Sequence, residues 1–505
     1  MNRWLIAFTI IIPTFIEVVD TSVVNVALDH IRGSLSAGVD EATWAITAYL
    51  VSNAIVIPLS GWLSRVFGRK NYLLFSVTLF TVSSFFCGCA WSLSSLIFFR
   101  VLQGIGGGAL QPISQSILLE TFPVKEHGKA MAVFAIGILF APVVGPVLGG
   151  WITDNWSWNW IFYINIPIGI LSVLMISQVI KDPPYLQRVP FSGIDYWGLI
   201  LIAIGLGCLQ VVLDKGQQDD WFSSPFIVCL SLVSALSLIM FVINELFIAK
   251  VPVVNLRIFK NIGFSAGNFI QFLAFFVLFG TIVALPIFLQ KLMGYNAFWA
   301  GLAIAPGGVV MILLMPLVGQ MLTRVNTKFM LVFGLSMSAV STWMMTGMNM
   351  SVDYGFVAWA RIVMGVGLAF TFMILMNLTL SSVKKEEMGN ASAIFNLIRN
   401  LGGSFGVAFI TTVLARQAQF HQARLAEEVT PLNPAYQMMV TKISAMPALH
   451  GQAPQGVIYQ DMMRQASLAS FVDVFYLCTV LLLLLIPFVP LLKRIDYARM
   501  SAAAH

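Results

Sequence analysis

Repeated apolar stretches, each long enough to cross a bilayer, constrain this sequence more than any other feature. A helix needs about 20 mainly apolar residues to span the hydrocarbon core. The 505-residue chain is 58% hydrophobic and 10% charged, with a mean hydropathy of +0.87, far from soluble globular proteins. We therefore predict an all-α polytopic membrane protein. Its fourteen expected transmembrane helices are 4–28, 43–63, 72–91, 95–119, 130–152, 160–180, 196–213, 225–248, 264–291, 299–322, 329–348, 355–380, 390–415 and 471–492.

Basic residues predict the orientation of these helices. An even number of spans puts both termini on one side, and most of the 28 Lys and Arg residues fall in connections on that side. The positive-inside rule then predicts cytoplasmic termini. The net charge of +6 is explained in this way, so we expect no nucleic-acid partner. Typical members of the basic set are Arg65, Arg69, Lys70, Lys250, Arg257, Lys260, Lys384 and Lys385.

An internal repeat with a period near 260 residues indicates two related halves. The matched positions are Pro58 to Gly61 with Pro316 to Gly319, Arg100 with Arg361, and Gly145 with Gly402. We therefore expect a six-helix bundle over 1–181, a linker with two inserted helices over 182–250, and a second six-helix bundle over 251–505. The second bundle includes a long outside segment, 416–470, whose Pro-rich middle suggests a surface loop able to dock a partner.

Two carboxylates inside the first apolar stretch are the leading functional candidates. Glu17 and Asp20 lie three residues apart, so a helix places both on one face. Ionised carboxylates in hydrocarbon are costly, and intramembrane acids usually serve function. Arg100 has a similar expected depth in the fourth span, so Asp20 and Arg100 can meet. The alternatives are a helix cap or a static buried ion pair.

Small residues recur every four positions in the fifth expected span. Gly137, Ala141, Gly145 and Gly149 form one smooth face on which another helix can pack closely, and prolines four residues apart are expected to bend the helix. The whole stretch, residues 137–150 (GILFAPVVGPVLGG), resembles the antiporter motif of the major facilitator superfamily. The motif residues are Gly137, Pro142, Gly145, Pro146, Gly149 and Gly150.

Other stretches are similar to the same superfamily, in particular its fourteen-helix EmrB/QacA branch of drug:proton antiporters. These are residues 20–28 (DTSVVNVAL), 100–106 (RVLQGIG) and 158–169 (WNWIFYINIPIG). The resemblance implies a major facilitator fold and proton-coupled multidrug export from the bacterial inner membrane, with Arg100 assisting proton transfer. Together with the two acids inside the first span, it predicts that Glu17, Asp20 and Arg100 take part in proton coupling. It also implies two partners, an EmrA-like periplasmic adaptor and a TolC-like outer-membrane channel.

Substrate-binding candidates are polar or aromatic residues within the expected helices. The ninth span is rich in Phe, and such surfaces can repack around varied apolar ligands, although lipid contact explains most of these side chains. Asp20 is favoured for protons, and Glu17 for both protons and cationic substrates. The full candidate set is Glu17, Asn25, Gln103, Gln111, Gln115, Asn268, Gln271, Phe272, Phe276, Asn377, Asn396 and Arg399.

Other function classes find less support in the sequence. The enzyme-like strings GFSAG at 263–267 and GIGGGA at 104–109 lie in expected membrane helices, away from the strands their chemistry needs. With no metal-ligand cluster or phosphate loop in the sequence, we expect no cofactor and no direct use of ATP. The rivals that stay open are a dedicated proton-coupled exporter or symporter of one metabolite and, more remotely, a membrane enzyme acting on lipid.

Overall fold

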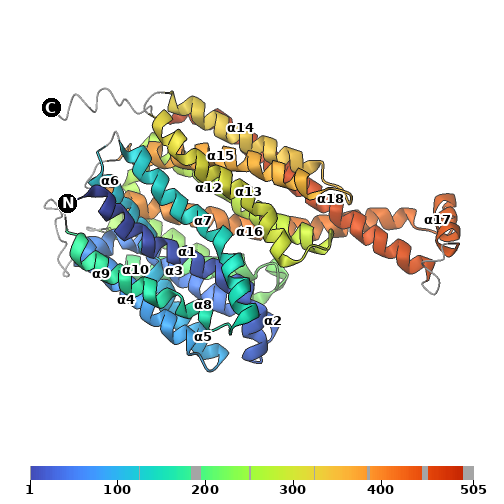
Figure 1. The fold of residues 1–505 in the computed structure, drawn as a ribbon, viewed down its shortest axis with the longest axis horizontal. Helices are drawn as coiled ribbons and strands as arrows, with labels where there is room; N and C mark the ends of the chain where they lie inside the picture. Colours follow the sequence, from blue (N-terminus) through green and yellow to red (C-terminus); the bar gives the residue numbers. More distant parts are fainter. Residues whose placement is uncertain are drawn as a thin grey trace.

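The computed structural model describes residues 2–123, 126–182, 195–249, 252–322, 325–383, 387–445 and 453–492. All regular structure within these ranges is helical, which confirms the predicted fold class (Figure 1). Thirteen helices there are long and apolar enough to cross a membrane, close to the fourteen expected. The remaining expected span lies in α7 (His127–Asn155), where the apolar stretch found is the shorter Lys129–Ile138.

The first bundle consists of six membrane helices, two of them interrupted. The expected fourth span is built from α5 and α6, and the sixth from α8 and α9. The bounds are α1 (Arg3–Ser34), α2 (Val39–Ala42), α3 (Trp44–Phe67), α4 (Arg69–Gly88), α5 (Leu93–Gly107), α6 (Leu110–Thr121), α7, α8 (Trp160–Tyr163) and α9 (Asn165–Val179). We call the end where α1 begins the inner end and the opposite end the outer end.

The second bundle follows two inserted helices. The insertion comprises α10 (Tyr196–Lys215), η3 (Trp221–Ser223), α11 (Pro225–Ile243) and η4 (Asn244–Ile248). After η5 (Leu256–Lys260), the second bundle contains α12 (Ile262–Lys291), α13 (Ala297–Met321), α14 (Thr327–Thr346), α15 (Tyr354–Leu380), α16 (Met388–Glu428), α17 (Pro434–Ser444), α18 (Pro454–Leu485) and η8 (Ile486–Leu491).

Glycines at repeated positions make equivalent helix contacts in the two bundles. A Cβ on Gly104 of α5 would lie 2.5 Å from the carbonyl oxygen of Tyr49 on α3. A Cβ on Gly365 of α15 would lie 2.1 Å from the carbonyl oxygen of Gly307 on α13. Only a residue without a side chain allows backbones to approach this closely. The sequence repeat therefore corresponds to a repeated packing arrangement.

The inserted helix α10 bonds to both bundles. The Thr47 hydroxyl on α3 donates to the Asp214 carboxylate, and the Ser404 hydroxyl on α16 donates to Gln210 Oε1 at 3.1 Å. Asp214 and Gln210 are four residues apart, so they lie on one side of α10. This side therefore bridges the first and second halves.

The outside segment 416–470 is built largely from helices. α16 continues to Glu428, α18 starts at Pro454, and α17 lies at the tip of a hairpin that projects beyond the bundles at the outer end (Figure 1). His421 Nε2 lies 2.7 Å from Asp473 Oδ2 and joins the two long helices near the base. The expected surface loop is thus a helical projection over its described residues.

Candidate functional site

Asp20 and Arg100 form an ion pair inside the first bundle. Arg100 Nη1 donates to Asp20 Oδ2 at 2.6 Å, and each residue is only 1% exposed. The pair joins α1 to α5. This geometry confirms the contact predicted from the expected depths of the two residues.

The second carboxylate oxygen of Asp20 accepts two amide hydrogen bonds. Gln103 Nε2 donates to Oδ1 at 3.0 Å, and Asn165 Nδ2 donates to the same atom at 2.6 Å. Both amides also donate to the Ser84 hydroxyl oxygen, at 3.3 and 2.8 Å. Three donors from α5 and α9 therefore satisfy both oxygens of the buried carboxylate. Sequence reasoning missed Asn165 and Ser84 because neither residue signals its partner in an apolar helix.

Arg100 is held by further contacts in the first bundle. Its Nε donates to the Ala45 carbonyl oxygen at 3.1 Å, and Nη1 also donates to Gln103 Oε1 at 2.7 Å. Its Cζ lies 4.3 Å from the centre of the Tyr49 ring, a cation–π distance. Loss of the Asp20 charge would therefore leave the guanidinium with other partners.

Glu17 occupies a separate site one helical turn away. The Tyr49 hydroxyl donates to Oε1 at 3.0 Å, Asn53 Nδ2 donates to Oε1 at 3.3 Å, and Gln111 Nε2 donates to Oε2 at 2.7 Å. Tyr49 thus touches Glu17 with its hydroxyl and Arg100 with its ring. The two acids share one bridging side chain, which the sequence did not indicate.

The Glu17 site reaches the second bundle through glutamines on α6. Gln111 Oε1 accepts a hydrogen bond from the Arg399 guanidinium on α16. One turn later, Gln115 Oε1 accepts bonds from Asn396 Nδ2 at 2.6 Å and from the Ser392 hydroxyl at 2.7 Å. Four predicted substrate-binding residues, Gln111, Gln115, Asn396 and Arg399, therefore lie together at the interface between the halves.

Apart from Glu17, which bonds to Gln111, the other predicted substrate-binding residues lie outside this interface cluster. Phe272 and Phe276 of α12 face α16, with ring centroids 5.8 Å from Phe405 and 5.5 Å from Phe409 respectively. The polar members are dispersed: Asn25 is exposed on α1, Gln103 belongs to the Asp20 site, Asn268 and Asn377 donate to their own helices, and Gln271 donates to the Phe395 carbonyl oxygen.

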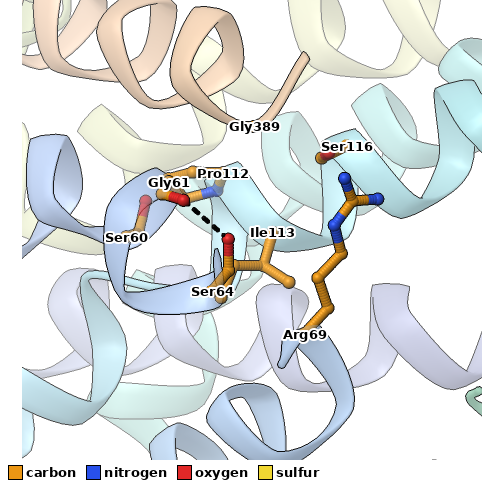
Figure 2. A pocket seen from close by; sticks show the side chains of 8 residues that line it. All are labelled: Ser60, Gly61, Ser64, Arg69, Pro112, Ile113, Ser116 and Gly389. Atoms are coloured by element: carbon orange, nitrogen blue, oxygen red, sulfur yellow. Dashed lines mark hydrogen bonds between the residues drawn. The ribbon is translucent and has the colours of Figure 1, made fainter. Parts of the chain in front are cut away.

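Two of the pockets among the described residues are small, and neither of these is lined by a predicted substrate-binding residue. The first, of about 190 Å³, lies at the inner end between α3, α4, α6 and α16 (Figure 2). Its wall includes Gly61 and Ser64, whose hydroxyl donates to the Gly61 carbonyl oxygen at 2.9 Å, with Gly389 of the second bundle opposite. The second pocket, of about 240 Å³, lies between α12, α14, α15 and α18 of the second bundle. The substrate site therefore stays a prediction.

The small-residue face of α7 packs on α1, the helix that carries both acids. A Cβ on Gly145 would lie 2.4 Å from Ser22 Cβ, and a Cβ on Gly149 would lie 3.1 Å from Val23 Cγ1. A Cβ on Gly137 similarly meets the Ile11 side chain at 2.9 Å, whereas a Cβ on Gly150 would meet nothing within 4 Å. Close packing is thus confirmed for three of the motif glycines. The side chains of Pro142 and Pro146 lie outside the described part of the structure.

Arg361, the repeat counterpart of Arg100, is buried in a different environment. It is 3% exposed, and its Nε and Nη1 have no hydrogen-bond partner among the described residues. The repeat therefore preserves the arginine without the carboxylate that satisfies it in the first half.

Known proteins with related sequences are named for multidrug export or for fatty acid resistance. The chain is 38% identical to the multidrug export protein EmrB of Escherichia coli K12 over 476 residues, covering 94% of this chain and 92% of the relative. It is 36% identical to the fatty acid resistance protein FarB of Neisseria gonorrhoeae over 483 residues, covering 95% and 94%.

Solved structures of transporters share the fold. The human organic anion transporter MFSD10 superposes with a TM-score of 0.61 at 12% identity, covering 95% of this chain and all of that one. The proton:xylose symporter XylE superposes with a TM-score of 0.59 at 13% identity, covering 92% and 94%. The sequence model of the Major Facilitator Superfamily matches residues 10–407. This multi-pass membrane protein, with two six-helix bundles and two inserted helices, therefore belongs to the Major Facilitator Superfamily of transporters.

Proposed function

We propose that the protein is a proton-coupled multidrug exporter that exchanges apolar or amphipathic compounds for protons by alternating access. The observation that carries the proposal is the buried ion pair between Asp20 of α1 and Arg100 of α5, because the antiporter-like glycine face of α7 packs on α1. The names of the EmrB relatives support multidrug export as the function.

Asp20 is the proposed proton carrier. Protonation of a carboxylate oxygen removes the charge that holds Arg100, and the guanidinium keeps its bonds to Gln103 and Ala45. The α1–α5 contact then weakens without exposing an unpaired arginine. Proton binding is thereby linked to movement of the helix that carries both acids.

Glu17 is proposed to bind either a proton or a cationic part of the substrate. It connects through Gln111 to Arg399, so a change in its charge acts on the interface between the halves. A substrate that neutralises Glu17 from the interface and a proton that does so from the first bundle would exclude each other. This competition is the core of an exchange mechanism.

Drug-evoked proton movement in proteoliposomes tests the proposal. Purified parent protein and the variants Asp20→Asn and Glu17→Gln are reconstituted with an imposed pH gradient and an internal pH dye. We expect the parent to release protons on addition of drug and Asp20→Asn to lose most of this signal. Glu17→Gln should weaken the signal mainly for cationic drugs.

The control is Asp353→Asn. Asp353 caps the start of α15 at the outer end, and asparagine caps helices equally well, so this variant removes one carboxylate with little structural effect. It should exchange protons at the parental rate. Parental rates in both Asp20→Asn and Glu17→Gln would show that the two acids do not carry the proton.

We also propose an orientation and a docking surface. The positive-inside rule supports cytoplasmic termini, and in a bacterial inner membrane the α16–α18 projection would then lie in the periplasm. Its exposed apolar side chains suit contact with an EmrA-like adaptor that would lead to a TolC-like outer-membrane channel. These side chains are Phe420, Leu425, Leu432, Met438, Met439 and Tyr459.

Site-specific crosslinking to a co-expressed adaptor tests this surface. Photoreactive residues at Leu432 and Met438, which are 91% and 64% exposed, should give adaptor adducts. A photoreactive residue at Phe329, exposed at the start of α14 at the inner end, should give none. Equal labelling at both ends would remove the projection as the docking site.

A second candidate is dedicated export of amphipathic carboxylates. The name of the FarB relative and the buried Arg399 at the interface favour it. Counterflow measurements with a fatty acid and a cationic dye on the same vesicles separate the candidates, because a dedicated exporter moves only the first.

A further inference from the structure

Two carboxylates outside the proposed transport site meet at the inner end of the inserted helices. Asp195 precedes α10, and Glu245 lies in η4 after α11. A Cβ on Gly198 would lie 2.5 Å from Asp195 Oδ2 and 2.8 Å from Glu245 Oε1. Both oxygens therefore converge on one point, and they are no farther apart than those two distances together.

Glu245 is buried and only half satisfied. It is 1% exposed, and its Oε1 accepts the Val253 N–H at 3.2 Å. Its Oε2 is buried without a hydrogen-bond partner among the described residues. A buried ionised carboxylate needs partners for both oxygens, whereas a neutral carboxylic acid needs far less compensation.

Among the described residues, the surrounding elements place no cation at the pair to balance two negative charges. α10 carries charged residues only in its last turn, Asp214 and Lys215, α11 has none, and η5 contributes Arg257 and Lys260, both exposed. Arg257 Nη2 donates to the Leu246 carbonyl oxygen at 3.2 Å. Asp195 accepts bonds from the first turn of α10 and from Asn244, as suits a charged helix cap. Glu245 is therefore the member that needs a proton.

A short chain of hydrogen bonds connects this pair to the contact between the halves. Two residues after Val253, the Asn255 N–H donates to Asn390 Oδ1 at 3.0 Å, and Asn390 Nδ2 donates to the Asn255 carbonyl oxygen at 3.2 Å. Asn390 lies in the first turn of α16, where a Cβ on Gly61 of α3 would meet its nitrogen at 3.0 Å. The segment from Val253 to Asn255 is thus bonded both to Glu245 and to the contact between α3 and α16 at the inner end. We call this contact the inner closure, and the segment from Val253 to Asn255 its brace.

We propose that Asp195 and Glu245 share one bound proton, and that its release loosens this brace at the inner end. With the proton in place, Glu245 is neutral and packs beside the charged Asp195. Without it, the buried Glu245 carboxylate faces the half-buried Asp195 carboxylate, and the site must open further to admit water or a cation. The pair is a second proton site, independent of the α1 acids, through which the pH at the inner end controls the inner closure.

Infrared difference spectroscopy of the full-length protein tests the bound proton. The parent-minus-Glu245→Gln spectrum should contain a carboxylic-acid C=O band that shifts in D2O and disappears as the pH is raised. In Asp195→Asn, which keeps a capping side chain, the band should disappear at a lower pH, because a neighbouring negative charge no longer favours the proton. Absence of the band in the parent, or the same midpoint in Asp195→Asn, would overturn the proposal.

Hydrogen exchange over residues 252–261 tests the effect on the brace. After correction for intrinsic exchange rates, raising the pH should lower protection in the parent roughly two- to tenfold, the equivalent of about one hydrogen bond. Glu245→Gln, which mimics the neutral acid, should stay protected at all pH values. Equal pH dependence in both proteins, or protection restored at high pH by Mg²⁺ alone without the infrared band, would show that a proton does not hold the brace.

Discussion

The hydroxyl of Tyr49 donates a hydrogen bond to Glu17 at 3.0 Å, and the ring of the same residue lies against Arg100. One side chain on α3 therefore contacts both Glu17 and the arginine that pairs with Asp20. A change in the charge of Glu17 alters a bond on Tyr49, and a shift of Tyr49 alters the surroundings of the arginine that pairs with Asp20.

Removal of the Tyr49 hydroxyl should break the contact of this side chain with Glu17 and leave its contact with Arg100 in place. In Tyr49→Phe, the ring stays over Arg100 while Glu17 loses a donor, so we expect a loss of about 1 kcal/mol in the free energy of unfolding. Reversible SDS unfolding measures this loss. Tyr49→Leu removes the ring as well and should cost more; equal losses would mean that the cation–π contact contributes nothing.

The glycine face of α7 should be sensitive to a single methyl group at one position and tolerant at another. Gly145→Ala places a Cβ 2.4 Å from Ser22 Cβ, which no rotamer change can relieve, so it should destabilise the protein by about 1–3 kcal/mol. Gly150→Ala, on the same helix with open space around it, should stay within about 0.5 kcal/mol of the parent. Thermal unfolding of both variants checks the difference, and equal midpoints would contradict the α1–α7 packing.

Alanine should disturb the contact between the halves at the inner end when it replaces Gly61, but not when it replaces Gly389. Gly61→Ala places a Cβ 2.8 Å from the Gly389 carbonyl oxygen, whereas the Cβ of Gly389→Ala has no neighbour nearer than 3.9 Å. Gly61→Ala should therefore shift the population toward an inner-open state by roughly tenfold, and Gly389→Ala should not.

Thiol labelling of Ser64→Cys, whose side chain lines the inner pocket, measures this shift. The exposed thiols are first removed with Cys89→Ser and Cys229→Ser. Labelling should be faster in the Gly61→Ala background alone. Equal acceleration by both alanine substitutions would mean that the contact does not close the inner end.

The Asp20–Arg100 pair should show strong coupling in a double-mutant cycle. Asp20→Asn leaves a buried guanidinium without its counter-charge, which typically costs about 3–5 kcal/mol. Arg100→Gln strands the carboxylate in the same way, and the double variant removes both charges. We expect the double variant to recover at least about 1 kcal/mol relative to additivity, measured by reversible SDS unfolding.

The fold could be predicted because its main determinants are local. Apolar stretches of membrane-spanning length indicate helices whatever their partners, and the depth of a residue in a helix follows from its distance to the helix end. These two properties were enough to predict the contact between Asp20 and Arg100. The small-residue spacing of α7 predicted a packing face but not that α1 is its partner.

The polar lining of the site could not be predicted, because a single polar residue in an apolar helix does not identify its partner. Asn165 completes the Asp20 site, whereas Asn268 bonds to its own helix, and both are asparagines in apolar surroundings. Glu245 was missed for a related reason, since its partner Asp195 is 50 positions away in the sequence, before the first inserted helix, whereas Glu245 follows the second. Only the folded arrangement of α10 and α11 brings these two acids together.

The bonds from α10 to both halves determine how the protein can move. Asp214 is held by Thr47 and Gln210 by Ser404, and the two acceptors are one turn apart on a stiff helix. Any rotation of one bundle past the other must break at least one of these bonds. In the proposed alternating-access cycle we therefore expect α10 to move as a third body, and the order in which it releases its two neighbours to decide which side opens first.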